Sequence, residues 1–168
     1  MYGNAADFIT YHTDRGRTIP GTWDNDYIEA ALLVASEWLD AKFDKLWVGY
    51  AVGGYSQTRK WPRASAVTNT FPATVLADTV IPQEILNGTY EAAWRETNNA
   101  GSLNLDYTPS KYRSVRIEGA ISVEYDTTVT HGSDVQTQIG IINNLMESLI
   151  DPIKFGNYAS LSGKAERV

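Results

Sequence analysis

The sequence predicts a mainly α-helical domain: a small helical bundle with one β element and an extended C-terminal tail. Apolar residues recur at steps of three and four in three separate segments, as they do on one face of a helix. A fourth segment alternates apolar and polar residues, as in a half-buried strand. The length of 168 residues, with 43% hydrophobic and 20% charged residues, suits one globular domain with a sizeable core.

The first predicted helix spans about Trp23–Trp47. Thr22 or Asp24 can cap its N-terminus, where the helix dipole favours negative charge. Its apolar stripe consists of Ile28, Leu32, Ala35, Leu39, Phe43 and Leu46. Gly49 ends the pattern, and Val48–Val80 has no sustained period, so we expect a long loop between the first and second helices.

The second predicted helix opens at Ile81-Pro82 and stops at Asn98, Asn99 and Gly101. Proline suits the first helical position because its missing N–H would have no partner there. The apolar face of this helix consists of Ile85, Leu86, Thr89, Tyr90, Ala93 and Trp94.

Alternation at residues 112–126 predicts the β element between the second and third helices. The alternating residues are Val115, Ile117, Gly119, Ile121, Val123 and Tyr125. This run is about twice a typical strand length, so we expect either a β-hairpin or one long strand bent at Gly119. We favour the bend, because Glu-Gly is not a preferred tight-turn pair. A single strand cannot form a sheet alone, so a hairpin or a second chain must support it.

The third predicted helix spans about Asp134–Ile150, with Ser133 and Gln136 placed as a capping box. Its apolar stripe consists of Val135, Ile139, Ile142, Leu145, Met146 and Leu149. Residues 1–152 thus form the predicted helical domain, and 153–168 form a tail. The tail carries Phe155, Tyr158 and Leu161 at three-residue spacing. It is either a frayed terminus or a segment that orders when it docks on a partner.

Composition excludes several kinds of chemistry. The chain has no cysteine, which rules out disulfides, thiolate metal sites and a cysteine nucleophile. Its two histidines, His12 and His131, lie far apart without a second ligand at suitable spacing, so we expect neither a metal nor a cofactor. No catalytic motif is present, and we expect a non-enzyme. No stretch reaches the roughly 20 apolar residues of a membrane span, and no signal-peptide pattern opens the chain, so we expect a soluble, intracellular setting.

The most informative local cluster is Gln57–Arg63, where Arg59, Lys60 and Arg63 surround Trp61 and Pro62. Three interpretations compete. Trp61 can pin the loop to the protein's own core, or Trp and Arg can form a hot spot for a protein partner. Alternatively, stacking and positive charge can form a platform for single-stranded nucleic acid. A net charge of −6 argues against a surface that is basic throughout.

At this cluster the chain resembles the head–tail connector proteins of tailed bacteriophages, also called adaptor or head-completion proteins. Some of them carry the description DnaT-like single-stranded DNA-binding protein. The shared motifs are a Gln-rich, basic approach to Trp61-Pro62-Arg63, then Ile81-Pro82 with Glu84, and later the Gly-centred segment Glu118–Tyr125 before a last short helix. The match covers about Asp7–Ile150. It implies that residues before the first helix, about Ala5–Arg15, also belong to the fold.

The resemblance implies a structural virion protein without enzymatic activity. Such proteins form a ring, commonly of twelve copies, beneath the portal of the filled head, in the virion neck. The implied partners are further copies of the chain, the portal protein, the next tail or neck component, and DNA that passes through the channel without sequence-specific contact. No membrane is involved, and assembly takes place in the host cytoplasm. The predicted assembly and partner-binding residues are Arg59, Trp61, Pro62, Arg63, Phe155, Tyr158 and Leu161.

Two functional classes therefore stand side by side: a structural ring protein, and a single-stranded DNA-binding accessory protein of replication. The acidic balance suits a channel through which DNA slides without being gripped. The abundance of Trp and Tyr suits large interfaces. We therefore favour the ring protein.

Overall fold

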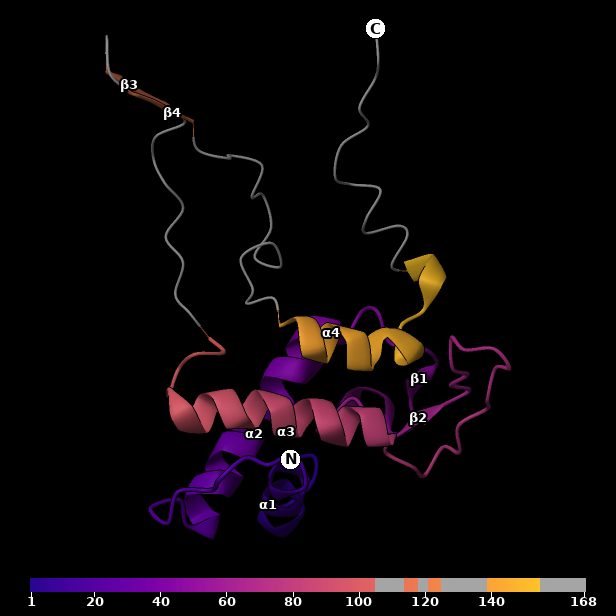
Figure 1. Ribbon diagram of the computed structural model, residues 1–168. Coiled ribbons are helices and arrows are strands. Elements are labelled where there is room, and N and C mark those ends of the chain that lie inside the picture. The colour runs from indigo at the N-terminus through magenta and orange to yellow at the C-terminus, as the bar shows by residue number, and fades with distance from the viewer. Residues whose placement is uncertain (105–113, 118–120, 125–138, 155–168) are drawn as a thin grey trace, which may run out of the picture.

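The computed structural model describes residues 1–104, 114–117, 121–124 and 139–154, and its helices pack into one body (Figure 1). The helices are α1 (Ala5–Thr13), α2 (Asn25–Phe43), α3 (Gln83–Asn98) and α4 (Gly140–Met146). α2 crosses α3, α4 lies alongside α3, and α1 packs on both α2 and α3. The prediction of a mainly helical small domain is confirmed.

The predicted stripe of α2 forms the centre of the core. Its members Ile28, Leu32, Ala35, Leu39 and Phe43 are all buried, and Leu46 is partly buried. Of the two predicted caps, Thr22 and Asp24, it is Asp24 that caps this helix: its Oδ1 accepts a hydrogen bond from the Tyr27 N–H at 2.8 Å.

The first helix ends earlier than the predicted Trp47. After Phe43 the chain makes a turn and then pairs with the other end of the domain. Trp47 forms an antiparallel bridge with Ile150, and the Val48 N–H donates to the Leu149 carbonyl at 3.0 Å. Pairing with a distant segment replaces the helical hydrogen bonds that the local pattern favoured.

The N-terminal residues form a helix of their own, α1, which periodicity did not single out. Asn4 caps it by accepting a hydrogen bond from the Asp7 N–H at 2.9 Å. Phe8, Tyr11 and His12 are buried. The implied place of Ala5–Arg15 in the fold therefore has a structural basis: α1 covers one side of the α2–α3 pair.

α3 begins one residue later than predicted, with Pro82 as its N-cap. Ile85, Thr89, Tyr90 and Ala93 are buried as predicted. Gly88, in the middle of this helix, allows a close approach of α4. A Cβ at this position would collide with the terminal methyl of Met146.

The β element is a hairpin, so the favoured single bent strand is wrong. β3 (Ser114–Ile117) pairs antiparallel with β4 (Ile121–Glu124). In the register, Val115 lies opposite Val123 and Ile117 opposite Ile121. Antiparallel pairing gives the backbone N–H and C=O groups hydrogen-bond partners, whereas a single bent strand would leave them unpaired. Gly119, the predicted point of bending, lies outside the described residues.

The third predicted helix is described from Ile139 onward. α4 is followed by a 3₁₀ turn at Glu147–Leu149, and Ile142, Met146 and Leu149 are buried as predicted. The helix stops short of Ile150 because that residue is the bridge partner of Trp47. The predicted capping box at Ser133 and Gln136 lies outside the described residues, as do Phe155, Tyr158 and Leu161.

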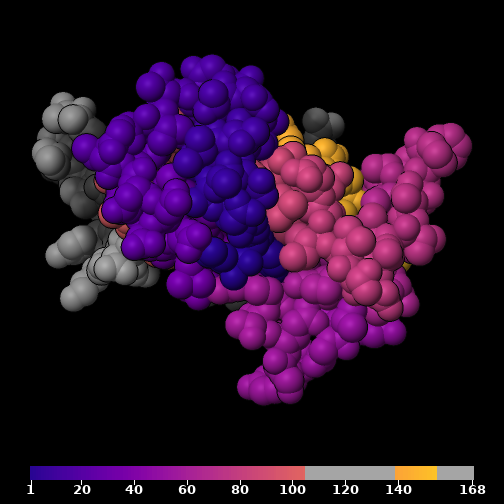
Figure 2. Space-filling view, turned by 90° about the horizontal axis from the view of Figure 1, so that it is seen from below, coloured from indigo at the N-terminus to yellow at the C-terminus, as the bar shows by residue number. Residues whose placement is uncertain are grey.

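The long segment between α2 and α3 has extended structure of its own. β1 (Tyr50–Ala51) pairs antiparallel with β2 (Arg63–Ala64), and Val67 bridges to Val75 beyond it. We call residues 65–77 the arm. Figure 1 shows the segment between α2 and α3 at one end of the helical body, and Figure 2 shows its magenta parts projecting from that body. The arm is thus a protrusion held at its base by the short β1–β2 pair.

Candidate functional site

Trp61, the centre of the predicted cluster, belongs to the core. Its side chain is 1% exposed and packs edge-on against Trp47, with 5.9 Å between the ring centroids. Its backbone N–H donates to the Tyr2 hydroxyl at 3.1 Å. As folded, the indole faces neither a partner nor a nucleobase, so the geometry agrees with the first interpretation, a loop pinned to the protein's own core.

Arg63 is buried beside Trp61 and ties the loop to the end of the α2 turn. Its Nε donates to the Val48 carbonyl and its Nη2 to the Gly49 carbonyl, both at 2.7 Å. Its Nη1 reaches the Lys60 carbonyl at 3.3 Å. Gly49 has φ +66°, and a Cβ there would collide with the Ala64 carbonyl. The guanidinium is therefore a structural bracket that holds β1 against β2.

The other two cations of the cluster face acidic groups of α2 and its C-cap. Arg59 forms ion pairs with Glu37 at 3.1 Å and with Asp40 at 3.5 Å. Lys60 pairs with Asp44 at 3.1 Å. These three carboxylates neutralise the positive charge that the sequence suggested for phosphate binding. The cluster therefore lacks the combination of free charge and free aromatic face that a single-strand platform requires.

Asp40 links this cluster to the chain's N-terminus. The Tyr2 hydroxyl donates to its Oδ1 at 2.6 Å, and the Lys60 N–H approaches its Oδ2 at 3.4 Å. Burial raises the pKa of Asp40, although the bonds from Tyr2 and Lys60 and the charge of Arg59 oppose the shift. Burial, together with the Asp40 charge, also raises the pKa of Tyr2. Asp40 thus connects Tyr2, near the N-terminus, to Arg59 and Lys60 at the base of the loop.

The segments on either side of this network expose large apolar side chains. Tyr55 and Phe71 are fully exposed, and Val75 is 74% exposed. Neither residues 47–58 nor the arm carries a charged side chain. Exposed aromatics without charge are typical of the centre of a protein–protein interface. The predicted cluster therefore acts on its surroundings by positioning other residues rather than by contact of its own.

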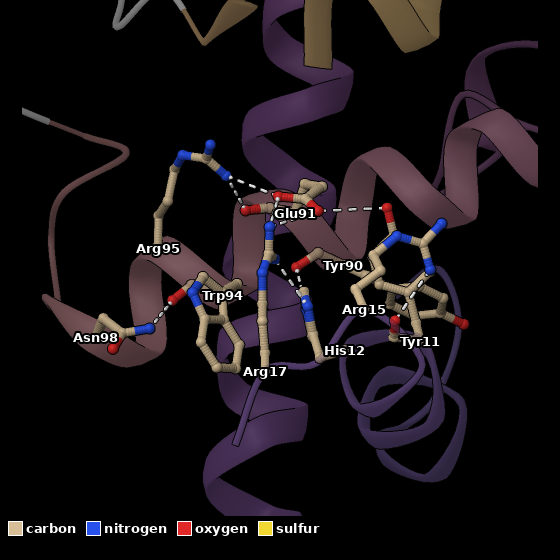
Figure 3. Close-up of polar contacts among 9 residues, drawn as sticks. All are labelled: Tyr11, His12, Arg15, Arg17, Tyr90, Glu91, Trp94, Arg95 and Asn98. Atoms are coloured by element: carbon tan, nitrogen blue, oxygen red, sulfur yellow. Dashed lines mark hydrogen bonds and ion pairs between the residues drawn. The ribbon is translucent and has the colours of Figure 1, made fainter. Parts of the chain in front are cut away.

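A second cluster, which sequence reasoning missed, surrounds the buried Glu91. Figure 3 shows Arg17, Arg95 and Tyr11 converging on its carboxylate. Arg17 Nη2 lies 3.1 Å from Oε1, and Arg95 Nη1 lies 3.3 Å from Oε2. Burial alone would raise the pKa of Glu91, but the hydrogen bond and charge of Arg17, with the hydrogen bond of Arg95, outweigh burial and lower the pKa.

His12 completes this Glu91 cluster. Arg17 donates to its Nδ1 at 2.9 Å, and its Nε2 lies 3.1 Å from the Tyr90 carbonyl. A ring that accepts at Nδ1 and donates at Nε2 is neutral. Burial, aided by Arg17 and Arg15, lowers the pKa of His12 to about 4. The cluster joins α1 to α3 with a buried polar network.

Next to this cluster lies an open depression of about 610 Å³. The residues that line it are Trp94, Arg95, Asn98, Asn99, Ser102, Ile139 and Gly140. Arg17 lies over the Trp94 ring at 5.2 Å. The Trp94 ring already packs against His12 and Arg17, so what the depression offers a nucleobase or its phosphate is hydrogen bonding by the partly exposed Arg95 and the amides of Asn98 and Asn99. In the neighbouring Glu91 cluster, Glu91 and Arg95 stand at i and i+4 on one helix, and this spacing was a visible sequence signal for their ion pair.

The residues that the structure describes contain no group of three His, Cys, Asp or Glu side chains placed to hold a metal ion. None of the helices in the described part of the chain is both long and apolar enough to span a bilayer.

In the described residues, fold and site together define a small helical domain that carries two buried polar networks, an exposed uncharged arm and a depression lined by Trp94 and Arg95. The model of a protein family described as "Putative DnaT-like ssDNA binding protein" matches residues 1–168. The chain belongs to this family. No curated protein and no solved structure matches the chain.

Proposed function

We propose that this chain is a structural virion protein that assembles into a ring below the portal and joins the DNA-filled head to the tail. One observation carries the proposal: Trp61 and Arg63 are buried, and they brace a projecting, uncharged arm that exposes Phe71 and Val75. In this fold the basic cluster holds the arm in place, and the exposed side chains of the arm suit contact with another protein. The ring, the twelve copies that the resemblance implies, and the portal as its partner are parts of this proposal.

The hairpin supports the same proposal. Among the described residues, β3 and β4 have strand partners in each other alone. A two-stranded hairpin is marginal in water without a third strand or a helix to pack on. A neighbouring subunit in a ring can supply that support.

The test is imaging of the virion neck with labelled protein, combined with native mass measurement of the purified chain. We expect label in a ring at the head–tail junction. Label found away from the neck, with a purified chain that stays monomeric at every concentration and in the presence of portal, contradicts the proposal.

A second candidate, binding of single-stranded DNA, is favoured by the family description and by the depression beside Trp94. It is tested by titrating a short DNA strand into the protein at two salt concentrations. Tight binding that weakens steeply with salt supports this function. Trp94→Ala and Arg95→Gln should then weaken binding, whereas the control Arg59→Gln, at the neutralised cluster, should not.

A further inference from the structure

The arm has an open β edge. The Thr68 N–H donates to the Thr74 carbonyl, and the Leu76 N–H donates to the Ala66 carbonyl, both at 2.9 Å. These two bonds flank the bridge between Val67 and Val75. In this antiparallel pattern, the N–H and C=O of Val75 point outward from the arm. They have no hydrogen-bond partner among the described residues.

No charged side chain protects this edge, although it is short and Pro72 directly precedes it. Natural edges are blunted by charged side chains, especially lysine, or are covered by another element. Residues 73–77, the segment that carries the open groups of Val75, contain no charged residue, and Val75 is 74% exposed. At the far end of this segment the Ala77 carbonyl accepts a hydrogen bond from the Val80 N–H. Such an edge accepts an added strand through backbone hydrogen bonds.

The C-terminal residues leave the described structure beside the arm. Lys154 Nζ donates to the Trp47 carbonyl, and Asn69 of the arm donates its N–H to the Ser148 carbonyl, both at 2.7 Å. Residues 155–168 follow directly, and extended they span up to roughly 45 Å at about 3.3 Å per residue. Their first part, residues 155–163, is uncharged and holds Phe155, Tyr158 and Leu161. Its composition therefore matches the uncharged edge.

The position of the edge favours a tail from another copy. The arm has two strand-like halves, one around Val67 and one around Val75, which pair with each other. Asn69, which contacts Ser148, follows the first half, whereas the open groups belong to Val75 in the second half. The half of the arm around Val67 thus lies between the chain's own C-terminal turn and the open edge at Val75. A chain of net charge −6 also meets a second copy with least repulsion at an uncharged surface.

We propose that residues 155–168 of one copy add as an extended strand along residues 73–77 of the next copy's arm. The donating and accepting surfaces differ, so the contact is head-to-tail, and such contacts generate rings when the rotation closes. This inference rests on the proposed ring and names the contact that builds it.

Two variants separate the halves of the contact. Val75→Pro removes the outward N–H at an edge position, where proline is tolerated. A chain truncated after Lys154 lacks the tail but keeps the edge. Val75→Thr is the matched control, because it keeps the N–H. Val75→Lys is a second edge variant, which places a charge on an already exposed side chain. Circular dichroism melting verifies that each variant folds.

Native mass spectrometry then reads out assembly. We expect the wild type and Val75→Thr to form large assemblies, and Val75→Pro, Val75→Lys and the truncated chain to remain monomeric. A mixture of Val75→Pro with the truncated chain should form a one-to-one complex that cannot grow, since each supplies the half that the other lacks.

Three outcomes overturn the inference. If the edge variants assemble like the wild type, or if the mixture stays monomeric, the tail does not add to this edge, although the ring remains possible. If the wild type itself never assembles, with or without portal, the proposed function fails as well.

Discussion

At the residue scale, Trp61 and Arg63 show how one motif can suit three roles until its burial is known. Their side chains are 1% and 6% exposed, so both act through the protein's own core. Pro62 lies between them, and together they hold the loop from which the arm extends.

Trp61→Ala should lower the free energy of unfolding by about 3–5 kcal/mol, because it leaves a cavity against Trp47. Chemical denaturation measures this change. The control is Tyr55→Ala, at a fully exposed position, which should change stability by less than about 0.5 kcal/mol. Equal stability of the two variants would contradict the core position of Trp61.

Arg63→Lys should cost about 1–3 kcal/mol, since one ammonium cannot replace a fork that contacts three carbonyls. Arg59→Lys keeps the charge near Glu37 and Asp40 and should cost less than about 1 kcal/mol. Urea unfolding of both variants checks the difference. A smaller loss at position 63 than at position 59 would refute the bracket role.

His12 should make the fold sensitive to acid. Its folded pKa is about 4, against about 6.5 in an unfolded chain, so the unfolded state takes up the proton first as pH falls. Its contribution to stability is therefore complete above pH 6.5 and is lost between pH 6.5 and 4, to a total of about 3 kcal/mol.

Urea unfolding at pH 7 and pH 4.5 measures this loss. His12→Gln keeps a donor and an acceptor but does not titrate, so it should lose clearly less stability across this range than the wild type. Glu91 keeps its two arginine partners in both proteins, so the difference between the two pH profiles reports His12 together with its charge coupling to Glu91. Parallel pH profiles would show that His12 does not contribute.

At the element scale, the helices follow their apolar stripes where these are long and regular. α2 and α4 provide matched tests, because each has a buried and an exposed apolar residue side by side. Leu32 and Ile142 are fully buried, whereas their neighbours Leu33 and Ile141 are each 43% exposed.

Leu32→Ala and Ile142→Ala should each cost about 2–5 kcal/mol through lost burial and a new cavity. Leu33→Ala and Ile141→Ala should cost far less. Thermal melting of the four variants checks both helix orientations at once, and a reversed order within either pair would mean that the helix is rotated.

At the scale of the whole molecule, the C-terminal segment and the folded body should be separable. Lys154 contacts the Trp47 carbonyl, so a cut after Lys154 keeps the contacts that the described residues make. We expect this truncated protein to melt near the wild-type temperature but to fail to join filled heads. Melting curves and a head-joining assay measure the two effects. If it joins heads as well as the full chain, the tail is dispensable for assembly.

Local pattern was sufficient for the helical class, for a cap at Thr22 or Asp24 and for the stripes of α2 and α3, because each depends on residues within one or two turns. It was insufficient at the ends of elements. The early end of α2 follows from pairing between Trp47 and Ile150, which lie about a hundred residues apart in the chain.

The sequence by itself determined that this protein is a small helical domain with a basic Trp-Pro-Arg loop and an uncharged segment after it. Only the tertiary structure decided what these parts do. It placed Trp61 in the core. It paired Arg59 and Lys60 with acidic residues of α2 and its C-cap, and it brought Arg17 next to Glu91. The physical reason is that burial and charge neutralisation depend on which distant residues meet, and periodicity within one element carries no record of its partners.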